Sequence, residues 1–485
     1  LTTQNNTSDV DAYNTAVGHL AGQLTTTAVR STLIGAGTGS AITTGSDNVG
    51  LGYRSLYNNT IGNTNVALGT ESMLTNVAAD RNVAVGYQSL YSMTSPTTLD
   101  TYHTAIGYYA GRNITSGLHN TLIGSLAGDA LTTGNYNVVL GTYALSSEDG
   151  HGANTALGYG ALYNQNAGAD AHNTAVGYNA GDQVSTGAYN TLIGSLTGDA
   201  LTTGGYNVAV GNYALGAEDA HGYNVAVGYS ALTAQNAGTD AYNVAVGYIA
   251  GQAISTGVRN VLLGGHAGDN ITTGSYNIAI GYHALGTEDG HGFNVAIGYA
   301  ALSTQDAGAD AYNTAVGYYS GVALTTGVLN TLIGGLAGDA LTTGSYNVAI
   351  GVEALGTEDT YGKNTAIGYA ALNALNAGAD GYNTAVGYNT GVAMTTGQSN
   401  VCIGGEAGKA LTSSSANVAI GRNALMTEDT EGLAVAVGHS ALKLQNATAA
   451  TYNVAVGYYA GAEVTTGAGN TLIGGQAGDS LTTGG

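Results

Sequence analysis

The 485-residue chain has very little of what ordinary globular domains use to build a core or a charged surface. It contains one cysteine, one proline, one phenylalanine and no tryptophan, and only 8% of its residues are charged. The single cysteine, Cys402, excludes an intrachain disulfide and does not indicate the redox compartment. Glycine occurs 79 times, yet 44% of the residues are hydrophobic, which is too many for a disordered low-complexity tract.

Basic residues are also scarce, with 9 lysines and arginines against 31 acidic residues and a formal net charge of -22. Binding to phosphates requires clustered basic side chains, so we expect neither a nucleic-acid partner nor an anionic membrane surface. No run of 18 apolar residues occurs, which argues against membrane insertion. The first residues lack the basic and apolar regions of a signal peptide.

A five-residue phrase, N-[TV]-A-[VIL]-G, recurs 27 times along the chain. Position one is Asn in 24 copies, position four is always Val, Ile or Leu, and position five is always Gly. From residue 120 onward the intervals cycle through 17, 17, 19 and 17 residues, which makes a block of 70. Before residue 120 the spacing is looser and includes an insertion that holds Pro96. We therefore divide the chain into irregular N-terminal coils, 1–119, and a regular region with the four-coil block, 120–485.

This period predicts an all-β fold, a β-solenoid of about 27 coils with 17–19 residues each. Seventeen residues are too few for two packed helices with a loop, and Gly, Asn and Thr are poor helix formers. The phrase is typical of a short strand whose side chains alternate between two faces. A second short segment and a turn ending in TTG or NAG complete the unit.

The alternation assigns a role to each position of the phrase. We expect the Val, Ile or Leu of position four to form an apolar column inside the coil. We expect Asn at a corner, with left-handed backbone angles and hydrogen bonds to its copies above and below. The Gly of position five indicates a positive φ or a neighbouring backbone too close for a Cβ.

Position three is the second clue. It is mostly Ala, and every fourth unit has a larger residue there: Leu122, Leu192, Leu262, Leu332, Cys402 and Leu472. With position four inside, this Ala-rich face would be a second apolar surface, which a lone chain seldom exposes over such a length. The pattern therefore predicts a homotrimer about a three-fold axis with the small-residue face inward.

The phrases NTAVGY, NVAIGY and NTLIG, with ALxxxxTG between them, resemble repeats of phage tail-fibre and tail-spike proteins. They are also similar to the head repeats of YadA-like trimeric adhesins. The resemblance covers the chain from Asn14 to its end and implies a left-handed trimeric parallel β-roll that serves as a shaft or an adhesive head. The YadA-type unit is shorter than 17 residues. Because residues 1–14 match the end of a 19-residue unit and the last residues stop inside a unit, we expect an excerpt of a longer fibre.

Three features are candidates for chemical sites. Five Glu-Asp pairs lie 70 residues apart, and three of them continue to His151, His221 and His291, which suggests a metal or, as we prefer, solvated acidic loops. The 34 tyrosines suit stacking along a rod, with glycan binding as the alternative. Thr203, Thr273 and Thr343 recur only every fourth coil, which disfavours an ice-binding array.

The sequence has no nucleophile elbow, no HExxH and no phosphate loop, and the paired carboxylates recur in every block instead of forming one unique pair. We therefore expect no enzyme activity, no catalytic or metal site and no cofactor, and we interpret Cys402 as a small core residue. The predicted function is the shaft of an extracellular trimeric fibre, a phage tail fibre involved in host attachment. The alternatives are a bacterial surface adhesin that binds a host glycan or receptor, and a homopolymeric matrix filament whose copies join end to end.

Overall fold

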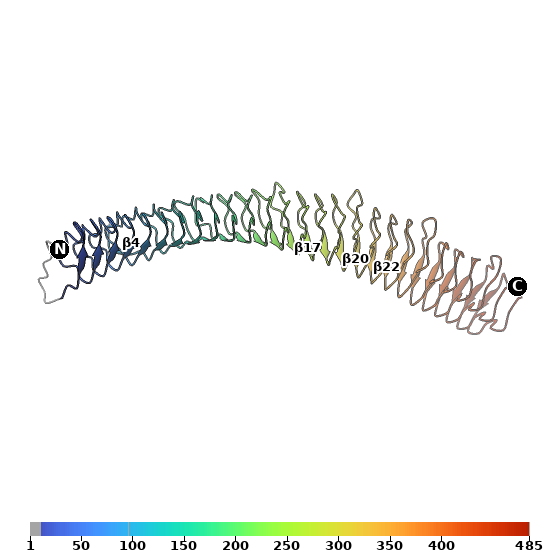
Figure 1. Cartoon of the computed structure of the whole chain (residues 1–485). Helices are drawn as coiled ribbons and strands as arrows, with labels where there is room; N and C mark the ends of the chain where they lie inside the picture. The colour runs from blue at the N-terminus through green and yellow to red at the C-terminus, as the bar shows by residue number, and fades with distance from the viewer. Residues whose placement is uncertain (1–10, 96, 485) are drawn as a thin grey trace. The chain divides into compact units, whose positions relative to one another are not determined.

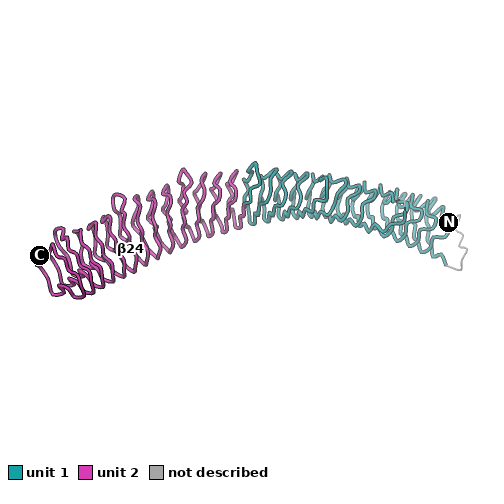
Figure 2. The backbone as a smooth tube through the Cα atoms, turned by 180° about the vertical axis from the view of Figure 1, so that it is seen from behind, with its two compact units in different colours: residues 1–242 teal, residues 243–485 magenta. Residues whose placement is uncertain are grey.

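The structure is a computed structural model that describes residues 11–95 and 97–484. Residues 1–10, which are part of the segment 1–14 where we expected the end of a 19-residue unit, and Pro96 lie outside the described residues. The chain divides into two compact units, residues 1–242 and 243–485, each of which is a stack of coils (Figure 2). Strands, turns and bends account for all the secondary structure of the described residues, which contain no helix.

Each copy of the repeated phrase forms one strand of three residues, from position two to position four, and neighbouring strands pair in parallel (Figure 1). In the first unit these strands are β1 (Thr15–Val17), β2 (Thr32–Ile34), β3 (Val49–Leu51), β4 (Val66–Leu68), β6 (Val83–Val85), β8 (Thr104–Ile106), β9 (Thr121–Ile123), β10 (Val138–Leu140), β11 (Thr155–Leu157), β12 (Thr174–Val176), β13 (Thr191–Ile193), β14 (Val208–Val210) and β15 (Val225–Val227). A separate parallel pair, β5 (Ala79–Asp80) and β7 (Leu99–Asp100), lies in the irregular region.

The second unit continues the same pattern without irregular intervals. Its strands are β16 (Val244–Val246), β17 (Val261–Leu263), β18 (Ile278–Ile280), β19 (Val295–Ile297), β20 (Thr314–Val316), β21 (Thr331–Ile333), β22 (Val348–Ile350), β23 (Thr365–Ile367), β24 (Thr384–Val386), β25 (Val401–Ile403), β26 (Val418–Ile420), β27 (Val435–Val437), β28 (Val454–Val456) and β29 (Thr471–Ile473). The parallel β-solenoid predicted from the period is confirmed, with one coil for each repeat.

The register places equal positions of the phrase above one another. Thr331 of β21 pairs with Val348 of β22, and Leu332 pairs with Ala349. Because the side chains of a strand alternate, each stacked position becomes a column along the unit. The columns of positions two and four lie on one face of the sheet, and the column of position three lies on the other.

The face that points into the coil is the opposite of the one that we expected. Position three is buried in every strand except the terminal β1 and β29, whereas position four is partly or largely exposed, as in Leu140 at 47% and Ile193 at 38%. The assignment of the Val, Ile and Leu column to the interior was therefore wrong, and so was the Ala-rich face as a surface between copies. The interior is narrow, and position three shares it with Asn of position one and with apolar side chains from the turns, so small residues fit there.

The recurrent leucine at position three compensates for missing side chains in the turns. Counted from the first residue of the phrase, position nine of a coil is occupied by Gly181 in one coil and by Gly198 in the next. A Cβ added to Gly181 would lie 2.6 Å from a Cδ atom of Leu192, and a Cβ added to Gly198 would lie 2.9 Å from the other Cδ atom. In the other two coils of a block, position nine is a buried leucine, such as Leu145 or Leu162. One leucine at position three thus fills the space beside two glycines, and a smaller residue at position three, such as Val139 or Ala156, accompanies Leu at position nine, so the core volume stays filled.

An asparagine ladder fastens each coil to the next. The side-chain oxygen of Asn330 accepts the backbone N–H of Asn347 at 2.9 Å, and its amide group donates to the carbonyl of Gly344 at 2.9 Å. The ladder of Asn residues is confirmed, but the left-handed conformation belongs to the residue before the Asn, as in Tyr346 with φ of 63°. The Asn side chain thus satisfies buried backbone groups at the corner that the left-handed residue creates.

Glycine at position five meets both conditions expected of it. Gly334 has φ of 135°, and a Cβ on it would lie 2.5 Å from the carbonyl oxygen of Gly351 in the next coil. The N–H of Gly334 donates to the carbonyl of Val316 in the preceding coil at 2.8 Å. The backbones of successive coils therefore approach too closely for a Cβ at the place where every copy of the phrase has its Gly.

Candidate functional site

The first carboxylate of each Glu-Asp pair lies inside the coil. Glu148, Glu218, Glu288, Glu358 and Glu428 all have 0% exposure. They stand at position twelve, where the other coils of the first block have Leu131, Gln165 and Val184, so this column is part of the core. Our interpretation of these pairs as solvated acidic loops is wrong for the glutamates, whereas Asp149 and Asp289 are exposed. Comparison of position twelve across coils would have indicated the burial, because its other occupants are mostly apolar.

The buried glutamates are held by backbone donors of the following turn. The Glu358 carboxylate accepts the N–H of Tyr361 at 3.2 Å and the N–H of Ala377 in the next coil at 3.3 Å. In the fifth block, Glu428 accepts the N–H of Glu431 at 3.3 Å and also a side-chain hydrogen bond of 2.8 Å from Gln445, the next residue of the position-twelve column. These bonds compensate in part for the loss of hydration of a buried carboxylate.

Burial raises the pKa of all five glutamates above the ordinary value. The pKa of Glu288 rises furthest, to about 7, because burial acts together with the negative charges of Asp306, Asp289 and Asp310. The third block therefore concentrates more negative charge around its buried glutamate than the other blocks do.

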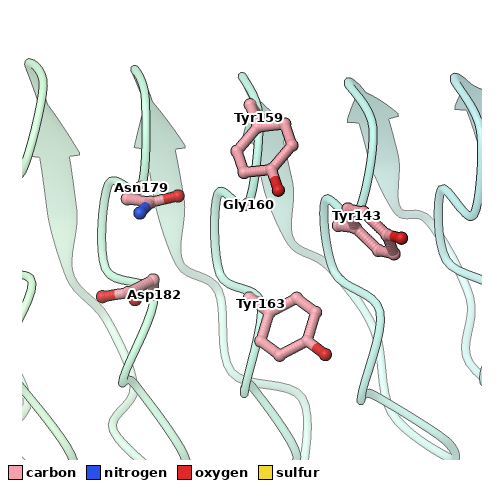
Figure 3. Close-up of a pocket in the computed structure, with 6 residues that line it drawn as sticks. All are labelled: Tyr143, Tyr159, Gly160, Tyr163, Asn179 and Asp182. Carbon is pink, nitrogen blue, oxygen red and sulfur yellow. The ribbon is translucent and has the colours of Figure 1, made fainter.

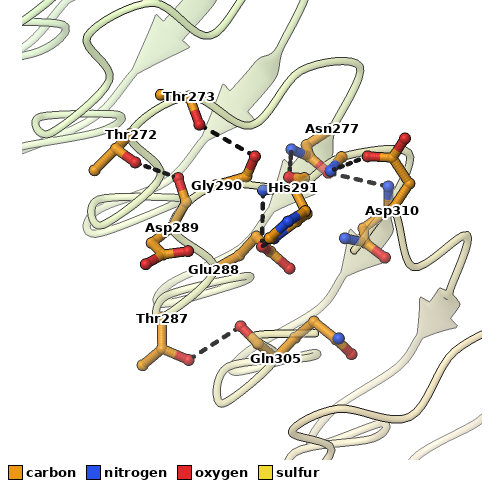
Figure 4. Close-up of polar contacts among 12 residues, drawn as sticks. Thr272, Thr273, Asn277, Thr287, Glu288, Asp289, Gly290, His291, Gln305 and Asp310 are labelled. Atoms are coloured by element: carbon orange, nitrogen blue, oxygen red, sulfur yellow. Dashed lines mark hydrogen bonds and ion pairs between the residues drawn. The ribbon is translucent and has the colours of Figure 1, made fainter. Parts of the chain in front are cut away.

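The three histidines that follow the Glu-Asp pairs fold back toward the glutamates, as Figure 4 shows for His291. The Nδ1 atom of His151 lies 3.8 Å from a carboxylate oxygen of Glu148, and the Nδ1 atom of His291 lies 3.7 Å from a carboxylate oxygen of Glu288. Among the described residues, three groups bring potential metal ligands within 4.8 Å of one another: Glu148, Asp149 and His151; Glu218, Asp219 and His221; and Glu288, Asp289 and His291 with Asp306. Asp306 belongs to the next coil, so the spacing of the Glu-Asp pairs did not indicate it.

The tyrosines before the Asn stack along the solenoid, as the structural interpretation predicted. The rings of Tyr189, Tyr206, Tyr223 and Tyr242 are 4.9–5.1 Å apart, with interplanar angles of 5–16°. Each ring in such a column covers the face of the next one, so the column presents ring edges to solvent. A sugar stacks on an aromatic face, and these faces are already occupied within the column.

A different group of tyrosines lines a pocket of about 430 Å³ in the first block (Figure 3). Its lining residues come from three successive coils and are Tyr143, Tyr159, Gly160, Tyr163, Asn179 and Asp182. Tyr143 meets Tyr159 and Tyr163 edge to face, with ring centroids 5.9 Å and 6.2 Å away. Burial raises the pKa of the Asp182 carboxyl on the opposite side of the pocket. This site was not predicted from the sequence, because its residues belong to different coils.

Gly160 lies in the lining of the pocket, where a Cβ would collide with the side-chain oxygen of Asn179, another lining residue. The pocket also depends on residues that the other blocks do not repeat. At the place of Tyr163 the second and third blocks have Thr233 and Ser303, and at the place of Asp182 the second block has Gln252. Three aromatic rings, a carboxyl and an amide around one small cavity are a set of groups that binds small polar ligands with an apolar face.

Two further residues are explained by the core. Cys402 is 1% exposed in the column of position three, and burial raises the pKa of its thiol to about 12, which confirms its interpretation as a core residue. His103 replaces the ladder Asn: its Nε2 is 2.7 Å from the carbonyl oxygen of Gly117, and its Nδ1 is 3.3 Å from the N–H of Asn120. A neutral imidazole with its proton on Nε2 makes the same two bonds as the Asn amide.

Comparison with protein-family models and with curated proteins finds no match to this chain. Among the described residues, none forms a helix long and apolar enough to cross a bilayer.

Proposed function

We propose that this protein is the structural shaft of an extracellular trimeric fibre, a phage tail fibre that takes part in host attachment. The repeated phrases resemble tail-fibre and adhesin-head repeats, and a stack of near-identical coils provides length and stiffness. The buried residues are spread evenly over the coils and do not converge on one reaction centre. Stability in such an array is nearly additive along the stack, as a shaft requires.

The observation that carries this proposal is the outer face of the sheet. In each coil the side chain at position two and that at position four lie partly exposed, and they form two continuous columns along each unit. Ile333 and Ile403 of the position-four column are each 37% exposed, and Val246 is 38% exposed. Position four is apolar in every coil, and monomers seldom expose an apolar column that runs over so many coils.

Three parallel copies cover this stripe when their sheet faces meet around a common axis. All copies have the same coil spacing, so a contact made in one coil is repeated in the next coil without loss of register. The Val, Ile, Leu and Thr side chains of both columns then form a core between the chains, and the turns stay outside. A closed three-fold arrangement leaves none of the three apolar faces uncovered.

The test is the mass of the assembly in solution. We expect sedimentation equilibrium of the purified chain to give three times the chain mass, and Ile333→Lys with Ile350→Lys to reduce it to the mass of one chain. Both side chains point out of the coil, so a lone chain tolerates the lysines, whereas the trimer would bury their charges. The control is a lysine at the exposed Thr326, in a turn of the same region, which should leave the trimer intact. A monomeric native chain would refute the proposal.

Electron micrographs of the native particle test the location of the fibre. A rod attached to a virion supports the tail-fibre proposal, and a rod on a cell envelope supports a bacterial adhesin. A free filament of indefinite length supports the matrix filament whose copies join end to end.

The pocket of Tyr143, Tyr159 and Tyr163 favours the adhesin as a second candidate function. Its aromatic rings and the Asp182 carboxyl provide the apolar and polar contacts that a sugar ring requires. Binding of the purified chain to an array of glycans tests this function, and Tyr163→Thr, the residue that the second block has there, should abolish the binding. Tyr229→Thr, outside the pocket, is the control. Absence of binding by the native chain would exclude this candidate.

A further inference from the structure

The third block contains a cluster of potential metal ligands that the other blocks do not complete. Glu288, Asp289, His291 and Asp306 each place one oxygen or nitrogen atom within 4.8 Å of the others. Glu288 and Asp289 begin a turn of one coil, His291 continues that turn, and Asp306 comes from the next coil. In the first and second blocks the corresponding cluster has three members.

Asp306 makes the difference between the blocks. The other blocks have an asparagine at the same place: Asn166, Asn236, Asn376 and Asn446. The histidine is also restricted, because the fourth and fifth blocks have Tyr361 and Glu431 instead. Among the described residues, the third block is therefore the one in which three carboxylates and an imidazole come together in a single cluster.

One carboxylate oxygen of the buried member of this cluster lacks a partner. The Glu288 side chain is 0% exposed; its Oε1 accepts the N–H of His291 at 3.1 Å, whereas its Oε2 has no hydrogen-bond partner. The Nδ1 atom of His291 is buried as well and has no hydrogen-bond partner. A buried carboxylate oxygen without a donor is costly, and a bound cation would remove that cost.

The backbone around the cluster is held in place by its neighbours (Figure 4). The hydroxyl of Thr273 donates to the carbonyl of Gly290 at 3.1 Å, and the amide of Asn277 donates to the carbonyl of His291 at 3.2 Å. The N–H of Gly292 donates to the Asp310 carboxylate at 3.1 Å. These bonds fix the turn that presents the ligands, so little reorganisation is needed when an ion binds.

We propose that Glu288, Asp289, His291 and Asp306 form a binding site for one divalent transition-metal ion, with Zn²⁺ as the best match. An imidazole with carboxylates is a ligand set for zinc and related ions, whereas Ca²⁺ and Mg²⁺ prefer oxygen ligands alone. Zn²⁺ holds four ligands at about 2.0–2.2 Å, so ligand atoms up to 4.8 Å apart need only small side-chain movements to reach it. Asp289 and Asp306 are exposed, which leaves a path for the ion. The site is independent of the proposed fibre function.

The test is an isothermal calorimetric titration with zinc chloride of the full chain, from which metal and EDTA have been removed beforehand. We expect a highest-affinity class of one ion per chain. Asp306→Asn and His291→Tyr should each weaken that class at least about tenfold, since each removes a ligand. Both variants introduce the residue that another block has at the same place, so the coil accepts them. The matched control is His151→Tyr in the first block, which should leave the highest-affinity class unchanged.

Hydrogen exchange provides a second measurement. Zinc should slow the exchange of the backbone amides in residues 286–310 of the native chain, and this protection should be absent in Asp306→Asn. An unchanged affinity in both variants would overturn the proposal and would place the zinc elsewhere, for example on His266, Asp269 and His283, where His266 Nδ1 is 2.9 Å from the Asp269 carboxylate. Tighter binding of Ca²⁺ than of Zn²⁺ would also overturn it, because His291 would then not be a ligand.

Discussion

Replacement of Gly334 by alanine tests the close approach of successive coils. Gly334 has φ of 135°, and the new Cβ would lie 2.5 Å from the carbonyl oxygen and 2.6 Å from the carbonyl carbon of Gly351. Both atoms belong to the backbone of the next coil, so no side chain can move away to make room. The coils must separate at this point, or the residue must adopt another backbone conformation and give up its hydrogen bond to Val316.

The magnitude follows from two costs. A non-glycine residue in a sparsely populated backbone region costs about 1–3 kcal/mol. Overpacking against a rigid neighbour adds about 1–3 kcal/mol. We therefore expect Gly334→Ala to lower the free energy of local opening by about 2–6 kcal/mol, and 2 kcal/mol already corresponds to about a 30-fold faster exchange.

The assay is native-state hydrogen exchange measured by mass spectrometry on peptides that cover residues 328–355. A global melting temperature is less informative, because a stack of coils opens locally. The control is Gly335→Ala at the next residue, where the nearest atom to a Cβ is the Tyr318 carbonyl oxygen at 4.0 Å. This control should change the opening free energy by less than about 1 kcal/mol. Equal exchange in Gly334→Ala and in the native chain would refute the argument that Gly at position five is required by the stacking.

Four other outcomes are expected. Asn330→Ala leaves the N–H of Asn347 and the carbonyl of Gly344 without their partners, which should cost about 2–4 kcal/mol of local opening free energy in hydrogen exchange. Burial lowers the pKa of His103 from 6.5 to about 4, so the free energy of local opening of its coil should fall by about 3 kcal/mol as the pH falls from 6.5 to 4. This fall should be absent in His103→Asn when hydrogen exchange is measured over the same pH range. Burial raises the pKa of Glu358, so the folded state binds its proton more tightly than the unfolded chain; local stability should fall as the pH rises above 4.5, and Glu358→Gln should abolish the fall. Cys402 should not react with a thiol reagent in the native chain and should react fully in denaturant.

Much of the local structure could be predicted because each residue of the repeat lies beside the residue at the same position of the next coil. An Asn at nearly every corner can bond only to a group that is also repeated, which predicts a ladder. A Gly that no coil replaces indicates a steric limit, which the carbonyl of Gly351 imposes on Gly334. Cys402 was assigned to the core for the same reason, because Leu has its place in the other blocks.

The chemical sites were harder to predict, because each combines residues of different coils. The pocket needs Tyr143, Tyr163 and Asp182 from three successive coils, and the proposed metal site needs Asp306 beside Glu288. The burial of Glu288 likewise follows from its place in the position-twelve column and cannot be inferred from the local sequence Glu-Asp-Gly-His.

The sequence alone determined the coil, its period and the residues that join one coil to the next, since these depend on contacts between identical positions. Which face of the strand lies inside was decided only by the tertiary structure. A strand with the sequence Thr-Leu-Ile has apolar residues on both faces, so the alternation of side chains separates the two faces but does not show which face is buried. The width of the closed coil decides which face is buried. The interior already holds Asn330 and the turn leucine Leu341, and the Ile333 column lies outside.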